Sequence, residues 1–348
     1  MRIALDAMGG DHAPAAIVEG AVLAARELDI GVALVGDERS VQVELAKHDA
    51  PAGRIEVVHA SQVIEMHESP ATALRAKLDA SMIRAVDLVA SGDAQAVVSA
   101  GNSGAFMGAA LWRLGAVKGV ARPAIAALLP ARSGSIVLLD AGANCDCRPK
   151  HLLQFAIMGD VYARRVLRIA HPRVALLNIG EEPAKGNELT KRAYAVLRAS
   201  DLNFVGNLEG TEFASGSADV VVCDGFVGNL ALKLGEGWAH LFVGRLQQAL
   251  AQVSPAVRED QSLARALHYL QRTLDYSEYG GALLLGVKAV VVISHGRSSP
   301  KALFSALRVA KESVESGVVT GVARSLHDRS LIAQAEADHS QPQELGSN

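Results

Sequence analysis

Short, uninterrupted apolar runs recur along the chain, and most of them end in a cluster of small polar residues. The runs occupy residues 2–5, 32–35, 55–58, 96–98, 136–139, 174–177, 220–223 and 289–293. A strand with one face in water alternates apolar and polar residues, whereas these runs are apolar at nearly every position, which is typical of strands buried on both faces. The sequence therefore predicts a mostly parallel sheet covered by helices on both sides.

The segments between these runs have the patterning of amphipathic helices. Residues 13–28, 69–89, 151–169 and 188–199 are the clearest, and Pro14 and Pro70 stand at the start of the first two. Alternation of strand, turn and helix predicts a three-layer α/β/α sandwich. We assign it to a single domain over residues 1–335, followed by a polar tail over 336–348 that we expect to be frayed.

One segment, residues 238–279, contains no strand candidate. Two sets of apolar residues there follow helical spacing on either side of Ser254-Pro255, namely Phe242, Leu246, Ala249, Leu250 and Val253, then Leu263, Leu267, Leu270 and Leu274. This pattern predicts a helical hairpin inserted into the sheet protein. Ordinary packing of the hairpin against the parent sheet is one reading of these stripes, and a binding surface is the other.

Composition and charge exclude several classes of protein. The chain has 348 residues, 50% of them hydrophobic, and a formal net charge of −3, which is unsuited to holding nucleic acid. Its three cysteines cannot all pair, which favours a reducing, cytoplasmic setting. The first apolar run is far shorter than the core of a signal peptide, and the longest apolar stretches have the length of strands rather than of membrane spans.

Several of the polar clusters at the strand ends are similar in composition, since they contain glycine followed by asparagine. Gly-Asn pairs stand at 101–102, 186–187, 206–207 and 228–229, and 142–144 reads Gly-Ala-Asn. Glycine lets backbone N–H groups approach a ligand closely, and asparagine adds donors without charge, so the clusters suit an anionic substrate. A single pair of this kind is more often a simple turn. No dinucleotide fingerprint, P-loop or nucleophile elbow is present in the sequence.

These clusters resemble the signatures of the bacterial phosphate acyltransferase family, over about residues 1–325 and in family order. The matching segments are MGGDHAP at 8–14, SAGNSGA at 99–105, LDAGAN at 139–144, NIGEE at 178–182, KGN at 185–187, GNLEG at 206–210, DGFVGN at 224–229, GGALLLG at 280–286 and SHGR at 294–297. Two departures are small: Ser103 stands where the family commonly has threonine, and Cys145-Asp146-Cys147 replaces a different polar stretch.

The resemblance implies a fold like that of isopropylmalate dehydrogenases and phosphotransacetylases, a homodimer, and no metal or organic cofactor. It also implies a reaction in which an acyl group passes from acyl carrier protein to inorganic phosphate, giving acyl phosphate for phospholipid (phosphatidic acid) synthesis. The product would then pass to a membrane glycerol-3-phosphate acyltransferase. We therefore expect a cytoplasmic enzyme with peripheral attachment to the membrane surface, in which the hairpin serves the dimer, an acyl groove or the membrane.

The resemblance also implies which residues act. Lys185 and Asn229 are the expected catalytic pair, holding phosphate or the oxyanion of the forming tetrahedral intermediate. The expected substrate- and phosphate-binding set is Gly9, Gly10, Asp11, His12, Ser99, Gly101, Asn102, Ser103, Asp140, Asn144, Asn187, Asn207, Glu209, Asp224, Gly228 and His295. A lone loop lysine is usually only solvated, and Asn229 would also serve as a helix N-cap, so both roles have simpler alternatives.

Other candidate sites are weaker on their residues alone. His12 and His295 are more often structural histidines in such positions. Asp6, Asp140 and Asp224 lack a recognisable metal-ligand spacing, and Cys145-x-Cys147 lacks the second cysteine pair of a zinc site. The basic stretch over 160–168, with Arg173, is either a docking face for acidic acyl carrier protein or a solvated helix face.

Two rival functions remain open. A metal-dependent hydroxy-acid dehydrogenase would use the same scaffold with clustered aspartates and a nicotinamide site. A non-catalytic scaffold recruited to the membrane would use only the hairpin.

Overall fold

The computed structural model describes residues 1–132, 134–252, 261–274 and 280–339. Its strands form one 11-stranded sheet in the order β3-β2-β1-β4-β11-β10-β5-β6-β9-β7-β8. The strands are β1 Arg2–Asp6, β2 Gly31–Gly36, β3 Ile55–His59, β4 Ala96–Ser99, β5 Ala124–Ala131, β6 Gly134–Leu139, β7 Val174–Asn178, β8 Phe204–Glu209, β9 Val220–Val222, β10 Ala282–Leu285 and β11 Val290–Ile293.

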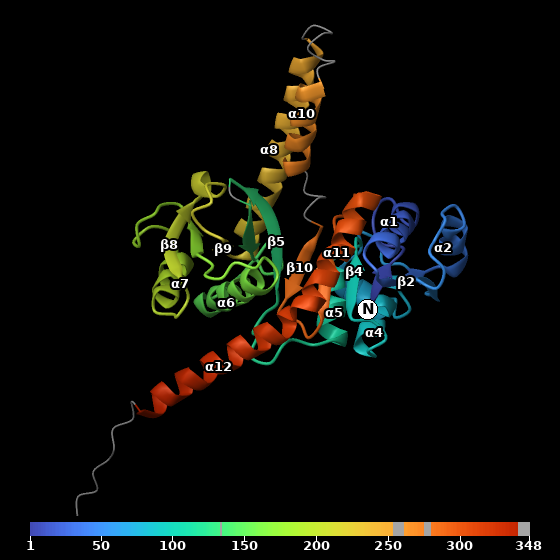
Figure 1. Ribbon diagram of the computed structural model, residues 1–348. Helices are drawn as coiled ribbons and strands as arrows, with labels where there is room; N and C mark the ends of the chain where they lie inside the picture. The colour runs from blue at the N-terminus through green and yellow to red at the C-terminus, as the bar shows by residue number, and fades with distance from the viewer. Residues whose placement is uncertain (133, 253–260, 275–279, 340–348) are drawn as a thin grey trace, which may run out of the picture.

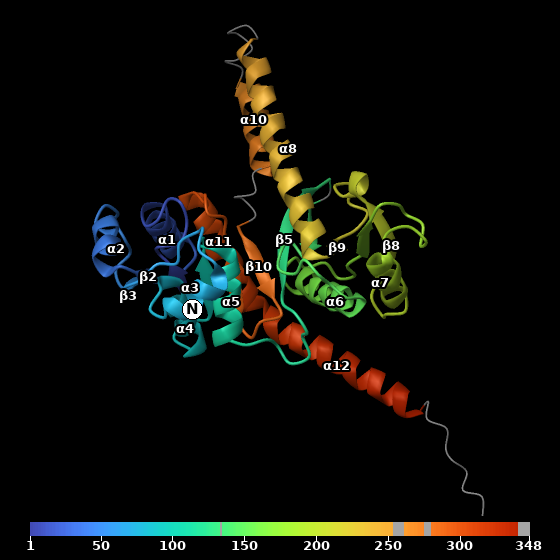
Figure 2. The ribbon, with the colours of Figure 1, turned by 180° about the vertical axis from the view of Figure 1, so that it is seen from behind.

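The helices lie on both faces of this sheet, which confirms the predicted α/β sandwich (Figures 1 and 2). They are α1 Ala15–Glu27, α2 Glu38–Leu45, α3 Pro70–Ala76, α4 Ser81–Ala90, α5 Ser103–Arg113, α6 Pro149–Arg165, α7 Glu188–Arg198, η1 Gly210–Glu212, α8 Gly225–Ala251, α10 Gln261–Leu274, α11 Pro300–Ser316 and α12 Val318–His339. One apolar cluster joins the sheet to α1, α6, α7, α11 and α12, and a second joins the other face to α3, α4, α5 and α8.

The sheet is mostly parallel, as predicted, but its centre is antiparallel. β3, β2, β1, β4 and β11 pair in parallel on one side, and β6, β9, β7 and β8 do so on the other. Between them, β10 is antiparallel to both β11 and β5, and β5 is antiparallel to β6. These three reversals make the two parallel halves run in opposite directions, so the carboxyl ends of their strands point to opposite edges of the sheet.

Three strands and one helix differ from the sequence prediction. β5, β8 and β10 were not predicted. β5 is alanine-rich with Pro130 near its end, and β8 contains the Gly206-Asn207 pair, which we counted among the polar clusters at strand ends. The predicted helix over 69–89 is two helices, because the chain leaves helical geometry at Lys77. The Lys77 ammonium donates to the Val63 carbonyl oxygen and pairs with Glu68, which holds this break in place.

α8 and α10 lie side by side and stand away from the body as a two-helix arm (Figures 1 and 2). α8 begins at Gly225, upstream of the predicted hairpin start at residue 238, because the Asp224 side chain caps the helix by accepting from the Val227 N–H at 2.9 Å. Of the predicted hairpin, residues 253–260 and 275–279 lie outside the described residues.

α12 projects from the other side of the body and continues to His339, so the first residues of the predicted polar tail are helical (Figure 1). Residues 340–348 of that tail lie outside the described residues. A search of the described helices for a segment with both the length and the apolarity to cross a bilayer finds none.

Candidate active site

A cavity of about 530 Å³ lies over the antiparallel centre of the sheet, between α5 and α8. Its floor includes Ile125 and Ala127 of β5 and Ala282 of β10, and its walls carry Ser103 and Met107 of α5 and Asn229 and Lys233 of α8. The loop between β11 and α11 closes one end of the cavity with Ser294, His295 and Arg297. A volume of this size is typical of a small-molecule site.

The strand ends of the first half of the sheet build the α5 side of the cavity. The buried Ser99 hydroxyl donates to Asp6 Oδ2 at 2.6 Å and accepts from the Gly101 N–H at 3.0 Å. Burial raises the pKa of Asp6, and the Ser99 hydrogen bond opposes that rise. A Cβ on Gly9 would lie 2.5 Å from Asp6 Oδ2, so only glycine allows this approach. Ser99, Gly9 and Gly101 therefore shape the loops rather than line the cavity.

Asn102 has a similar supporting role. Its Oδ1 accepts from the Ala105 N–H at 3.0 Å and so caps α5, while its Nδ2 donates to the carbonyl oxygens of Met66 and Glu68 at 3.1 and 3.0 Å. These bonds fix the loop that brings Met66 to the cavity, and the cap places Ser103 at its wall.

The β11–α11 loop supplies titratable groups. His295 Nδ1 accepts from the Arg297 N–H at 3.2 Å, and Gly296 accepts from the Asp11 N–H at 2.7 Å, so the loop is tied to the Gly9-Gly10-Asp11 turn. Burial lowers the pKa of His295, and the Lys233 ammonium lowers it further. The imidazole is therefore neutral at neutral pH. His12 is exposed and does not line this cavity.

The α8 wall carries the groups of the second half of the sheet. Gly228 packs so closely on the Asp140 backbone that an added Cβ would collide with the Asp140 carbonyl oxygen. Asn229 follows, and a Cβ on Gly142 would lie 3.4 Å from Asn229 Cβ. Four residues later, Lys233 Nζ pairs with Glu236 Oε2 at 2.9 Å. Lys233 and Glu236 were not predicted from the sequence, although their spacing from Asn229 places them on the same helix face.

Asp140 and Asn144 are internal to the protein. The buried Asp140 carboxylate accepts from the backbone N–H groups of Ile125, Gly142, Ala143 and Asn144, and from Asn144 Nδ2, at 2.7 to 3.1 Å. Burial raises the pKa of Asp140, and these hydrogen bonds oppose that rise. With both carboxylate oxygens occupied, Asp140 organises the loop that presents Gly142, and it offers no free acceptor to a ligand. Asn144 completes the loop by donating to the Pro123 carbonyl oxygen at 2.8 Å.

Lys185, Asn187, Asn207 and Glu209 form a second group at the ends of β7 and β8, and none of the four lines the cavity. Asn187 caps α7 by accepting from the Thr190 N–H, and Asn207 Nδ2 donates to the Glu182 carbonyl oxygen at 3.0 Å. Lys185 is exposed, and its ammonium makes no ion pair within the described ranges. β7 pairs in parallel with β9, so this group and the start of α8 leave the same edge of the sheet.

The aspartates that were considered as metal ligands make contacts within the protein instead. The three aspartates considered for a metal do not meet: Asp6 binds Ser99, Asp140 holds its own loop and Asp224 caps α8. Among the described residues, no three side chains of His, Cys, Asp or Glu lie close enough together to hold a metal ion. Burial raises the pKa of Cys147 to about 12 and that of buried Cys223 as well, so both thiols are protonated at neutral pH.

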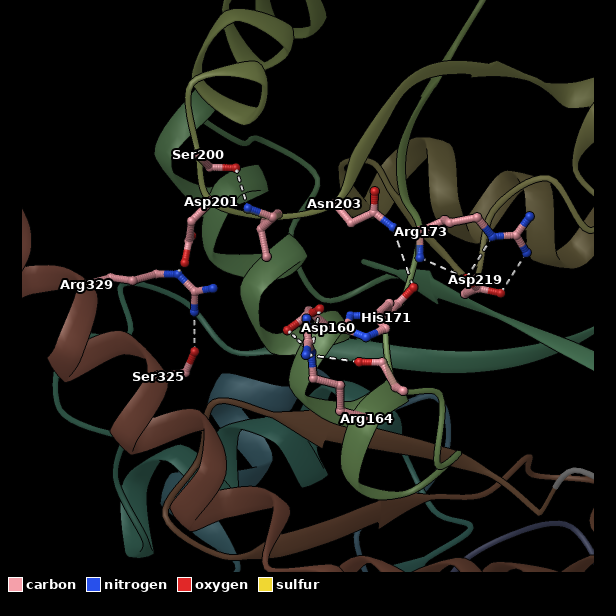
Figure 3. Close-up of polar contacts among 12 residues, drawn as sticks. Asp160, Arg164, His171, Arg173, Ser200, Asp201, Asn203, Asp219, Ser325 and Arg329 are labelled. Carbon is pink, nitrogen blue, oxygen red and sulfur yellow. Dashed lines mark hydrogen bonds and ion pairs between the residues drawn. The ribbon is translucent and has the colours of Figure 1, made fainter.

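The basic stretch on α6 is paired within the protein (Figure 3). Arg164 Nε donates to both oxygens of Asp160 at 2.9 and 3.0 Å, and Arg173 donates to both oxygens of Asp219 at 3.0 and 2.9 Å. Arg165 donates to the Ser316 carbonyl oxygen. These pairs reduce the positive charge that this surface offers to an acidic partner.

Solved structures with the same fold define a class. A phosphotransacetylase from Streptococcus pyogenes superposes with a TM-score of 0.61 over 90% of this chain and 94% of its own, at 16% identity. A branched-chain phosphotransacylase from Enterococcus faecalis gives 0.55 over 90% and 99%, at 18% identity. The fold is therefore that of the phosphotransacetylases, with a cavity where the two halves of the sheet meet.

Sequence relatives define the family within that class. The "Fatty acid synthesis protein" family matches residues 1–321. A phosphate acyltransferase from Desulforamulus reducens is 51% identical over 94% of this chain and 98% of its own length, and one from Pelotomaculum thermopropionicum is 49% identical over 94% and 95%. The chain belongs to the phosphate acyltransferase family. It is an acyltransferase whose reaction involves phosphate, and the resemblance noted in its sequence is confirmed.

Proposed function

We propose that this protein transfers an acyl group from acyl-acyl carrier protein to inorganic phosphate, releasing acyl phosphate and the free carrier, for phospholipid synthesis. The observation that carries the proposal is the cavity itself. It brings Asn229 and Lys233 of one half of the sheet opposite His295 and Arg297 of the other half. Asp11 and Glu236 also line the cavity and pair with the two cations, at 4.0 Å for Arg297 and 2.9 Å for Lys233. The Asn229 amide and the remaining N–H groups of Lys233 and Arg297 are the donors that suit an anionic acceptor and a developing oxyanion.

The reaction needs little acid–base help from the protein. An oxygen of hydrogen phosphate attacks the thioester carbonyl carbon, the C–S bond breaks, and the carrier sulfur leaves as a thiolate. The proton that phosphate gives up on forming acyl phosphate is taken by this thiolate, directly or through water. Phosphate is already anionic at neutral pH, and a thiol with a pKa near 8.5 is a good leaving group. What the protein must supply is position and stabilisation of the tetrahedral oxyanion. We assign the oxyanion to Asn229 in the cavity and to Lys185, whose loop lies outside the cavity but leaves the sheet at the same edge as the start of α8. We assign the approach of phosphate to Lys233 and Arg297.

The direct test mixes purified protein, a defined acyl-acyl carrier protein and phosphate. Incorporation of radiolabelled phosphate into a lipid-extractable product measures acyl phosphate, and a thiol reagent measures the free carrier. We expect equal amounts of both products, and neither when phosphate is omitted. Thiol release without acyl phosphate would contradict the proposal. Reduction of NAD with a hydroxy acid would instead support the dehydrogenase reading.

The role of Asn229 makes a sharper prediction. Asn229→Ala removes a donor to the oxyanion and is expected to lower kcat by about 10²-fold, the usual cost of one such donor. Asn229→Asp is expected to be worse, because it sets a negative charge against phosphate. Gln247→Glu is the matched control, since it makes the same change of charge at an exposed position further along α8. An Asp variant more active than the Ala variant would contradict the oxyanion role.

The arm supports the proposed homodimer and the proposed attachment to a membrane surface. On α8, Leu230, Leu234, Trp238 and Phe242 follow one another at intervals of four residues, and their side chains are 52%, 54%, 68% and 53% exposed. An apolar stripe of this kind is costly to leave in water. Packing against the parent sheet, the simpler reading of the predicted hairpin, does not cover it.

Leu267 and Leu270 of α10 provide the test. Leu267→Glu or Leu270→Glu is expected to weaken dimerisation or the binding of anionic lipid vesicles, because each variant places a charge on an apolar helix face. Analytical ultracentrifugation measures the first property and vesicle flotation the second, with Gln261→Glu at the start of α10 as the control. A dimer mass and vesicle binding that both match wild type would remove the arm from either role.

A further inference from the structure

The floor of the cavity includes two small side chains, Ala127 and Ala282, beside the larger Ile125. β5 and β10 are antiparallel with Leu283 opposite Ala126, so continuing the register by one residue sets Ala282 beside Ala127. Side chains alternate between the faces of a strand. Ala126 and Leu283 accordingly pack into the core on one face, while Ala127 and Ala282 lie on the other, below α5 and α8.

This pair of alanines accounts for the space above it. At the same level, Met107 of α5 and Leu232 of α8 pack against the same apolar cluster as Ala127 and also line the cavity. Residues larger than alanine at positions 127 and 282 would fill the gap between the two helices. The polar groups Asn229, Lys233 and His295 lie around this apolar floor rather than across it. The cavity thus offers an apolar trough beside a polar wall, in which Lys233 pairs with Glu236 and Arg297 with Asp11.

We infer that the trough over Ala127 and Ala282, walled by Met107 and Leu232, seats the hydrocarbon chain of the acyl donor and sets the chain length that the enzyme prefers. This inference rests on the proposed function and extends it to a part of the substrate that no reacting group touches. A saturated chain gains affinity from each methylene that it buries, by about fourfold in binding. The affinity stops rising once the acyl chain is longer than the trough, so the side chains that set the length of the trough also set the preferred chain length.

The test compares chain lengths within one variant, so a partial loss of folding cancels in the ratio. Saturated acyl-acyl carrier proteins from C6 to C16 are assayed with phosphate for acyl phosphate. Ala127→Leu adds three heavy atoms to the floor and is expected to lower the ratio of kcat/KM for C16 to that for C6 by about 50-fold. Ala282→Leu is expected to act in the same direction and covers the case in which the first variant does not fold.

Met107→Ala provides the opposite change. It widens the trough, and the chain length at which kcat/KM stops rising is expected to increase by about three carbons. Chain-length profiles of all three variants that run parallel to wild type, whatever their absolute level, would overturn the inference, because the floor would then contact the carrier's pantetheine arm or only the thioester. Wild-type protein that forms no acyl phosphate from any donor would overturn the proposed function, and this inference with it.

Discussion

Replacement of Lys185 by alanine is expected to lower kcat by about 10²-fold or more while leaving the thermal unfolding temperature unchanged. Lys185 is exposed, so its loss removes little buried surface. Its charge is available for a substrate, since within the described part of the chain its ammonium pairs with no carboxylate. Lys233, the lysine that lines the cavity, is instead paired with Glu236.

The loop that carries Lys185 is held firmly, which favours a positioned cation over a solvated one. Gly186 has φ +94, and a Cβ there would collide with the side chains of Asn178 and Thr190. Asn178 Nδ2 donates to the Lys185 carbonyl oxygen at 3.2 Å. Because β7 and β9 are parallel neighbours, this loop leaves the sheet at the same edge as the helix that bears Asn229.

Lys191→Ala is the matched control for Lys185→Ala, since Lys191 is an exposed lysine in the first turns of α7. It is expected to keep wild-type turnover. Lys233→Ala distinguishes the role of Lys233 from that of Lys185. Loss of a charge that steers phosphate is expected to raise KM for phosphate more than it lowers kcat. A Lys185→Ala enzyme with near wild-type kcat at saturating phosphate would remove Lys185 from the mechanism and leave Lys233 as the reacting cation.

Gly228→Ala is expected to destabilise the protein by about 1 to 3 kcal/mol or more and to abolish most activity. The added methyl would collide with the Asp140 carbonyl oxygen and would lie 2.9 Å from Cys223 Sγ. Either α8 or the Asp140 loop must move. That loop carries Gly142, which packs on Asn229, so the shift would displace the proposed oxyanion donor.

The same helix offers a control substitution whose expected effect on the free energy of unfolding is opposite. Gly235 is exposed on α8, and an added Cβ there would meet nothing within 4 Å. Gly235→Ala is therefore expected to stabilise the protein by about 0.5 to 1 kcal/mol, because alanine loses less backbone freedom than glycine in a helix. Urea unfolding of both variants checks the pair. Equal stability of the two would show that α8 does not pack tightly on the Asp140 loop.

Much of the fold could be predicted from the sequence, because a buried parallel strand is a continuous apolar run that can be recognised locally. The predicted runs at 32–35, 55–58 and 174–177 lie within β2, β3 and β7. The strands at the centre of the sheet are less clearly marked by such an apolar run. β5 is alanine-rich and contains Pro130, and β10 has only the residues Ala282–Leu285, so neither stands out from the loops beside it. β5 pairs with β6, and β10 with β11, as neighbours along the chain, but the antiparallel pairing of β10 with β5, which joins the two halves, brings together residues far apart in the chain.

The site could be predicted only in part, for a related reason. Motif spacing identified the loops, but it did not separate side chains that face the cavity, such as Asn229, Ser103 and His295, from side chains that hold the loops, such as Asp140, Ser99 and Asn102. Hydrogen-bond partners decide that difference, and for Asp140 they include the backbone of Ile125 on a strand that was not predicted.

The layered α/β architecture, the family and the set of polar loops follow from the amino-acid sequence alone, because apolar periodicity and short motifs are local properties of the chain. Which of those loops share one cavity depends on how the strands pair in space. The reversals through β10 and β5 turn the two parallel halves of the sheet in opposite directions, so loops of the same composition reach different edges. Lys185 follows β7, in the same half of the sheet as Lys233, yet it lies outside the cavity that Lys233 lines. The cavity itself has space where the small side chains of Ala127 and Ala282 meet across β5 and β10.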